Sequence, residues 1–217
     1  MATSATPSGA EPTDTLSASG SFTGKVRHIK IANAYGTAIF YGDFVKLVSS
    51  GTVEKAAVTT AAVAGTVGIF VGCAFTDPTT NQKTFSQYYP ASTAADDIVA
   101  YVVDDPKLLF RMQGDGSIAQ TGLGNNVQAI STAGSTSIGR SRNALDASSI
   151  ATTNTFPLRI VDFVDGPSST VGDAYTDCIV TWLPGSHAYD TALGVKLGGL
   201  SNGYFTRTNA EGTPAGA

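Results

Sequence analysis

Charged side chains are scarce in this sequence. Asp, Glu, Lys and Arg make up 14% of its 217 residues, against about 25% in an average soluble domain. The net charge is -4, and the nearest approach to a basic cluster is the stretch Lys25, Arg27, His28 and Lys30. A surface that binds the phosphates of nucleic acid needs more clustered Lys and Arg than this. We therefore do not expect nucleic acid as a partner.

Long apolar runs and a secretory signal are also lacking. Apolar residues make up 42% of the chain but are spread in short runs, well below the ~18 consecutive apolar residues of a membrane span. The first residues, MATSATPSGAEPTDTLSASGS, have neither the basic start nor the apolar middle of a signal peptide. We expect no membrane partner, and we expect the chain to be made and folded in a cytoplasm.

The residue types that usually carry catalysis or bind metals are few and far apart. The two histidines, His28 and His187, and the two cysteines, Cys73 and Cys178, have no zinc-ligand spacing. No Gly-x-Ser-x-Gly elbow, phosphate-binding Gly loop or EF-hand pattern is present. Both cysteines lie in apolar runs, which favours buried, inert thiols. We expect no enzymatic activity, metal or cofactor, and a hydrolase built on a Ser, His187 and an Asp is the weakest alternative.

What the sequence has in quantity is glycine, small hydroxyl residues and aspartate. Fourteen of the seventeen acidic residues are Asp and 24 residues are Gly, a usage typical of turns rather than of helix interiors. Short apolar or alternating runs recur with turn residues between them, which predicts an all-β barrel or sandwich. The expected strands are 25–32, 38–48 with a bulge or bend at Gly42-Asp43, 52–59, 66–75, 84–89, 97–104, 107–113, 157–165 and 177–184.

The two ends of the chain differ from the middle. Residues 1–24 and the C-terminal extension 194–217 are rich in Ala, Thr, Ser, Pro and Gly, a composition that buries too little apolar surface to order itself. We expect a flexible or extended N-terminal arm, a β-rich body over 25–193 and a short C-terminal tail. Within the body, the polar stretch 131–155 is expected to be loop-rich, and 187–193 to form one or two helical turns.

The stretch VVDDPKLLFRMQGDGS (102–117) contains three aspartates, which could form an acidic site or mark the ends of strands. Asp104 and Asp105 are neighbours, so on a strand their side chains point to opposite faces. Pro106 favours an extended geometry before it and ends the strand. Asp115 stands between two glycines, as in a tight turn. The pattern favours turns at strand ends over catalysis.

Aromatic residues leave two interpretations open. They could stack on a glycan or a single strand, but they more often anchor a core or an interface. The first interpretation supports an alternative function, a carbohydrate-binding or receptor-binding fibre or head-fibre module. The residues concerned are Tyr88, Tyr89, Tyr175, Trp182, Tyr189, Tyr204 and Phe205.

Four segments of strands and turns are distinctive: GDFVKL, GIFVGCAFTDPTTNQKTFSQYYPAST, IVAYVVDDPKLLFRMQGDGSIAQTGLGNN and LRIVDFVDGPSSTVGDAYTDCIVTWLPGSH. Together they resemble a group of structural proteins of tailed bacteriophages, the capsid decoration or cement proteins of the head. The resemblance covers roughly residues 35–190 and rests on these strand and turn segments rather than on a catalytic signature.

The resemblance implies an all-β protein on the outer surface of an icosahedral head, where it reinforces contacts between major capsid subunits. Its expected partners are the major capsid protein and further copies of itself, as a homotrimer or homodimer. The arm and the tail lie outside the resemblance and would reach a neighbouring subunit. The candidate contact residues in them are Pro7, Pro12, Leu16, Phe22, Tyr204 and Phe205.

Overall fold

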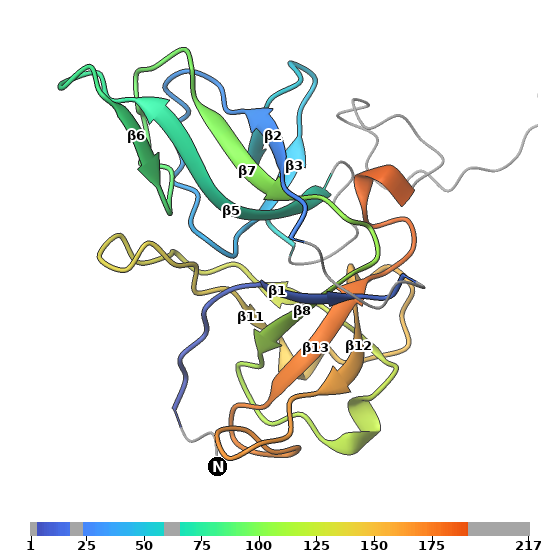
Figure 1. Cartoon of the computed structure of the whole chain (residues 1–217). Helices are drawn as coiled ribbons and strands as arrows, with labels where there is room; N and C mark the ends of the chain where they lie inside the picture. The colour runs from blue at the N-terminus through green and yellow to red at the C-terminus, as the bar shows by residue number, and fades with distance from the viewer. Residues whose placement is uncertain (1–3, 18–23, 59–65, 191–217) are drawn as a thin grey trace, which may run out of the picture.

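The computed structural model describes residues 4–17, 24–58 and 66–190 and confirms the all-β fold. Two antiparallel sheets form the two halves of the molecule in Figure 1. The upper sheet has the order β2(Arg27–Lys30)-β7(Val99–Val103)-β5(Thr66–Thr76)-β3(Phe44–Leu47)-β4(Val53–Lys55), with β6(Lys83–Ser86) also paired to β5. The lower sheet has the order β1(Glu11–Thr15)-β8(Leu108–Gln113)-β13(Asp177–Trp182)-β12(Leu158–Phe163)-β9(Asn126–Val127).

Short elements complete the described part of the chain. A small hairpin, β10(Ala129–Ile130) and β11(Ala144–Leu145), forms a separate two-stranded sheet whose long loop projects from the body (Figure 1). Three single-turn helices are η1(Gln120–Gly122), η2(Ala147–Ser149) and η3(Ala188–Asp190). The last of these lies within the stretch where helical turns were expected, and residues 191–193 lie outside the described residues.

The main core lies between the two sheets and is centred on three aromatic side chains. Phe44 comes from β3, Phe110 from β8 and Trp182 from β13. Their ring centroids are 5.9 Å apart for Phe44 and Phe110, and 5.3 Å apart for each of the other two pairs. Such tilted and edge-to-face contacts add to the stabilisation from burial. The trio therefore joins the upper sheet to the lower one.

A second core fills the other face of the upper sheet. Ile69 of β5 faces the main core, while its neighbour Phe70 belongs to the second core. Successive side chains of a strand alternate between faces, and a strand buried on both sides is apolar throughout. The expectation that the 66–75 run is apolar on both faces is confirmed, since both faces of β5 are covered.

The upper sheet curls but does not close. A single parallel bridge between Ile31 and Val53 brings the chain after β2 close to β4. A barrel needs a continuous hydrogen-bonded ladder between its first and last strands, and no such ladder links β2 and β4 in the described residues. The body is therefore a sandwich of a curled sheet on an open one, rather than a barrel.

The aspartates of 102–117 form turns and strand ends. Asp105 Oδ1 accepts the backbone N–H of Lys107 at 2.9 Å, and the Asp105 carbonyl accepts that of Leu108 at 3.2 Å. Asp104, at the end of β7, pairs with Arg27 of β2. Asp115 Oδ1 accepts the Ala147 N–H at 2.9 Å. Each of these three carboxylates holds its own turn or a neighbouring element of the fold.

The N-terminal segment is a correction to the sequence-based expectation. Residues 1–24 were expected to form a flexible or extended arm, but Glu11–Thr15 is the edge strand β1 beside β8. Ala10 is fully buried in the main core, and its N–H donates to the Gly42 carbonyl at 2.9 Å. Pro12 is tolerated here because an edge strand leaves some N–H positions unpaired. Composition missed this strand because its stabilisation comes from contacts with distant residues.

We predict that Phe110→Ala lowers the free energy of unfolding by about 3–5 kcal/mol, because it leaves a cavity between the two sheets. Phe110 is fully buried, whereas Phe85 is 73% exposed. The matched change Phe85→Ala should therefore cost less than about 0.5 kcal/mol. Urea denaturation followed by far-UV circular dichroism measures both values, and equal losses would contradict the assignment of Phe110 to the core.

Candidate interaction surface

The most exposed large apolar side chains of the described residues are Phe85, 73% exposed, and Ile138, 60% exposed. Phe85 lies on β6, and Ile138 lies in the loop between β10 and β11. Both elements project on the same side of the body (Figure 1). Aromatic side chains are enriched at protein interfaces, and burying an exposed aliphatic side chain beside one adds to the apolar area removed from water.

The two projections touch each other. A Cβ on Gly139, the residue after Ile138, would lie 3.3 Å from Cβ of Gln87. Gln87 lies two residues after Phe85, at the bend that directly follows β6. We call the exposed residues Phe85 and Ile138, with Gln87 and Gly139 where the two projections meet, the tip surface.

A rigid base supports the tip surface. Below it the rings of Phe40 and Tyr88 stack with centroids 5.4 Å apart and planes 11° apart. Gly134 of the projecting loop lies so close to Phe40 that a Cβ on it would be 2.3 Å from the ring. Arg140 lies over the Tyr41 ring at 5.2 Å and pairs with Glu11. The loop is thus held at both of its ends, and less ordering is needed when a partner binds.

Charges beside the tip surface are paired. Lys83 Nζ lies 2.7 Å from Asp97 Oδ2, and both side chains are half exposed. The hydrogen bond from Lys83, with those from the Thr76 backbone and hydroxyl, holds the pKa of Asp97 well below its usual range.

The second edge of β6 meets no strand among residues 4–17, 24–58 and 66–190. An unpaired edge next to exposed apolar side chains is a surface suited to a protein partner.

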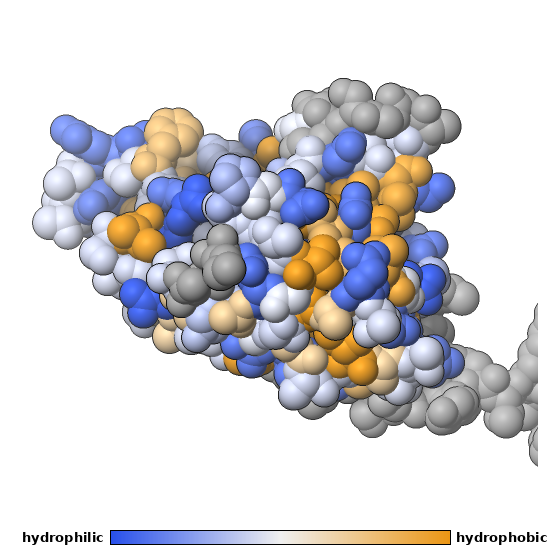
Figure 2. Space-filling view, turned by 90° about the horizontal axis from the view of Figure 1, so that it is seen from below, coloured by the Kyte–Doolittle hydropathy of each residue, from blue (hydrophilic) through white to orange (hydrophobic). Residues whose placement is uncertain are grey.

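A different apolar group lies on the underside of the molecule. Figure 2 shows apolar side chains gathered on this face, which includes the region around η1. Leu123, directly after η1, is 44% exposed. The yellow-green turn of η1 lies at the lower end of the body and β6 at the upper end (Figure 1), so Leu123 provides a control position for the tip surface.

The contact residues expected from the sequence are only partly described. Leu16 is 52% exposed, at the opposite end of β1 from Glu11, and Pro7 and Pro12 are half buried. Phe22, Tyr204 and Phe205 lie outside the described residues. The structure does not place Leu16 on the tip surface, because β1 spans about 17 Å between its ends and only its Glu11 end contacts Arg140.

The contact residues expected from the sequence did not include Phe85 or Ile138. The signal for Phe85 was present, since its face of the strand reads Lys83, Phe85, Gln87, a polar pattern around one aromatic. A core-facing strand would repeat apolar residues at that spacing. Ile138 lies in a polar loop, and its nearness to β6 depends on how the hairpin packs, which no local pattern encodes.

Two of the aromatic residues considered as stacking platforms are interior. Tyr89 is fully buried and its hydroxyl donates to the Tyr35 carbonyl at 2.9 Å, and Trp182 is 4% exposed in the main core.

The free thiols Cys73 and Cys178 are also buried, and burial raises the pKa of each to about 12. Thiols held in this state are poor nucleophiles.

His187 is enclosed and holds the turn that leads into η3. It is fully buried, and its Nδ1 accepts the Tyr189 N–H at 3.2 Å. Its ring lies 5.6 Å from Trp182 and 5.4 Å from Tyr189. Burial lowers the pKa of His187, and the Val67 backbone and the carboxylates of Asp104, Asp105 and Asp190 offset this only in part. The weakest alternative, a hydrolase using His187, has no solvent-accessible base at this position.

The described residues contain no group of three or more His, Cys, Asp and Glu side chains placed to hold a metal ion. Among the helices of this part of the chain, none could span a bilayer. Comparisons with protein-family models, with curated proteins and with solved structures give no significant match to the chain.

The burial of His187 predicts a loss of stability in mild acid. Its pKa is lowered from 6.5, so the unfolded chain binds a proton that the folded state resists. The stability that the neutral, buried His187 contributes to the fold is fully present above about pH 6.5. It is lost as the pH falls toward the pKa of His187 in the folded state. Urea denaturation between pH 7.5 and pH 5, within the range of about 5 to 8 where histidine titrates, measures this loss.

His187→Gln should flatten the pH dependence of the free energy of unfolding. His28→Gln is the control, since His28 is the only other histidine and is exposed on β2. An unchanged slope in His187→Gln would contradict the role of His187.

Proposed function

We propose that this chain is a structural protein of a tailed-bacteriophage virion that decorates the outer surface of the icosahedral head. It binds the major capsid protein, stabilises contacts between capsid subunits and has no enzymatic activity. The observation that carries the proposal is the tip surface, in which exposed Phe85 and Ile138 stand on a rigid base. The likeness of several segments to head decoration proteins, and the all-β sandwich, support it.

The tip surface suits a protein partner more than a small ligand. Its apolar residues project outward rather than line a cleft, and the free edge of β6 offers backbone groups to an extended segment of a neighbour. Burying an exposed Phe or Ile contributes about 1.5–3 kcal/mol each. A shell binds many copies at once, so moderate affinity per site is enough to reinforce it. We expect the chain to act as a homotrimer or homodimer on this shell.

Co-sedimentation with empty capsids of the phage that encodes the chain tests this proposal. Phe85→Ser and Ile138→Ser should each weaken binding at least tenfold, equivalent to about 1.4 kcal/mol. Leu123→Ser is the matched control, since Leu123 is 44% exposed on a different face, and it should bind like the unchanged chain. Equal binding by all three variants would remove the tip surface from the interface.

Point substitutions are a better test than removal of residues 1–24. Deleting that segment would also remove β1 and Ala10 from the fold, so weaker binding could result from unfolding. Mass spectrometry of purified virions gives the copy number directly. Absence from the virion, or only a few copies in each particle, would rule the proposed function out.

The alternative, a carbohydrate-binding or receptor-binding module, is favoured by one observation, the 73% exposure of the Phe85 ring. An exposed aromatic face can stack on a sugar as well as on a protein. A glycan array distinguishes the two functions. Glycan binding that is lost in Phe85→Ala, with capsid binding absent, would replace the decoration role by the alternative.

A further inference from the structure

Away from the tip surface, a lysine, an aspartate and an asparagine meet in the interior. Asp43 is fully buried, and both of its carboxylate oxygens are occupied. Oδ2 lies 2.9 Å from Lys55 Nζ and accepts the Phe40 N–H at 2.9 Å. Oδ1 accepts hydrogen bonds from Asn143 Nδ2 at 3.1 Å and from Ser141 Oγ at 2.7 Å. One carboxylate thus bridges a primary amine and a primary carboxamide.

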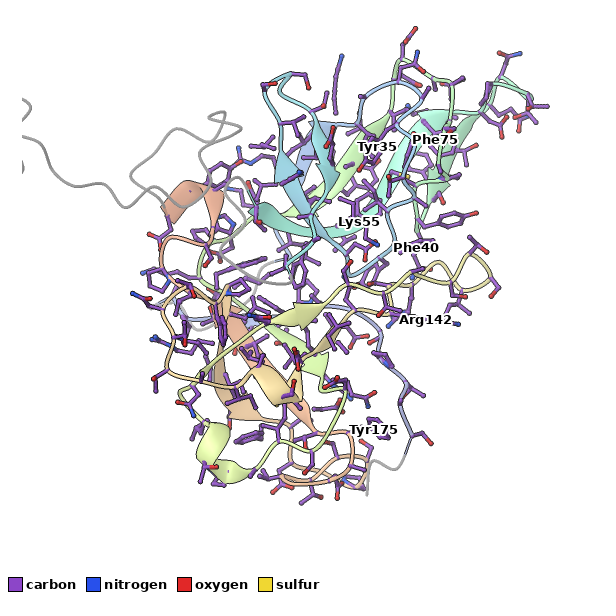
Figure 3. The ribbon with its side chains drawn as sticks, turned by 180° about the vertical axis from the view of Figure 1, so that it is seen from behind. Tyr35, Phe40, Lys55, Phe75, Arg142 and Tyr175 are labelled. Atoms are coloured by element: carbon purple, nitrogen blue, oxygen red, sulfur yellow. The ribbon has the colours of Figure 1, made fainter. Side chains whose placement is uncertain are left out.

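These groups come from distant parts of the chain and meet in a place shielded from water. Lys55 ends β4 of the upper sheet, and Asn143 directly precedes β11. Lys55 is 14% exposed, and Asn143 is 2% exposed. The Lys55 ammonium lies 5.9 Å from the centroid of the Phe40 ring. Figure 3 shows Lys55 and Phe40 together at the base of the upper half, above the segment that carries Arg142, the neighbour of Asn143.

The carboxamide of Asn143 is held by hydrogen bonds at both its oxygen and its nitrogen. Its Oδ1 accepts the backbone N–H of Thr132 at 3.0 Å, and its Nδ2 donates to Asp43. A backbone donor on the carbonyl oxygen stabilises the negative charge that develops there when a nucleophile adds to the carbon. The nitrogen that would leave, Nδ2, is hydrogen-bonded to the Asp43 carboxylate, which is the group that would protonate it. Holding the reacting groups together in this way replaces a bimolecular encounter.

We propose that Lys55 and Asn143 form an intramolecular isopeptide bond, with Asp43 as the proton carrier. Oδ2 of Asp43 takes a proton from the Lys55 ammonium, and the free amine adds to Cγ of Asn143 while Thr132 N–H holds the oxygen. The C–N bond to Nδ2 breaks as the protonated Asp43 carboxyl turns about its Cβ–Cγ bond and delivers the same proton to Nδ2. The second amine proton leaves with the ammonia, so one ammonium ion is released and the Asp43 carboxylate is restored.

The atoms and charges of this reaction balance without any further reactant. An ammonium and a carboxamide give a secondary amide and an ammonium ion, and nothing is oxidised or reduced. Two charges buried without water are costly, and passing the proton from Lys55 to Asp43 removes both. The bond would tie β4 to the start of β11 across the joint between the upper sheet and the projecting hairpin.

The intact mass of the purified full-length chain tests the bond. The expected mass is that of the sequence less one ammonia, apart from any removal of the first methionine. A tryptic digest should show a branched peptide joining the segments around Lys55 and Asn143, with no cleavage after Lys55. A mass equal to that of the sequence in the folded protein, after incubation at neutral pH, overturns the proposal.

Two other mass results also overturn it. Loss of one water would make Asp43 rather than Asn143 the acceptor. Loss of ammonia with normal cleavage after Lys55 would mean a cyclised asparagine and no link. Neither result depends on capsid binding, so failure of this inference is separate from failure of the proposed function.

Matched variants test the roles of Lys55 and Asp43. Lys55→Arg and Asp43→Asn should both restore the full mass. Lys83→Arg changes another lysine that pairs with an aspartate, and Asn126→Asp changes another buried asparagine. Both controls should keep the branched peptide, and a branched peptide that persists in Asp43→Asn would remove Asp43 from the reaction. Because the wild-type mass is decisive by itself, the inference stays testable even if a variant fails to fold.

Discussion

The contact among Phe44, Phe110 and Trp182 is the interaction on which the rest of the structure depends. It is where β3 of the upper sheet meets β8 and β13 of the lower one. Each sheet turns an apolar face toward the other, and stacking these two faces removes both from water. The edge strand β1, the turn at Asp104 and Asp105, and the η3 region are all arranged around this joint.

The projecting hairpin connects this framework to the proposed function. Its loop carries Ile138 at the tip, rests on Phe40 through Gly134, and leads back to Asn143 beside Asp43. The same segment therefore contributes to an exposed apolar surface and to a buried polar network. An isopeptide bond at its base would keep the tip surface rigid, which suits a protein whose proposed task is to hold neighbouring subunits of a shell together.

Local sequence patterns predicted much of the fold. The alternation of Leu108, Phe110 and Met112 predicted which face of β8 is buried, and all three are 1% exposed or less. The apolar run at 66–75 predicted a strand covered on both faces. The bend expected at Gly42-Asp43 is present, with Gly42 at φ 87°. Strand β1 was missed because Glu11–Thr15 has no apolar period and pairs with residues far along the chain.

The sequence by itself determined that this is an all-β protein, where its main strands run and which side chains enter the cores, because side-chain alternation and turn residues act over a few positions. Only the tertiary structure decided that Phe85 and Ile138 share one surface, that the N-terminal segment belongs to the lower sheet, and that Lys55, Asp43 and Asn143 meet. These juxtapositions join residues far apart in the chain, and they arise from the packing of whole sheets rather than from any local propensity.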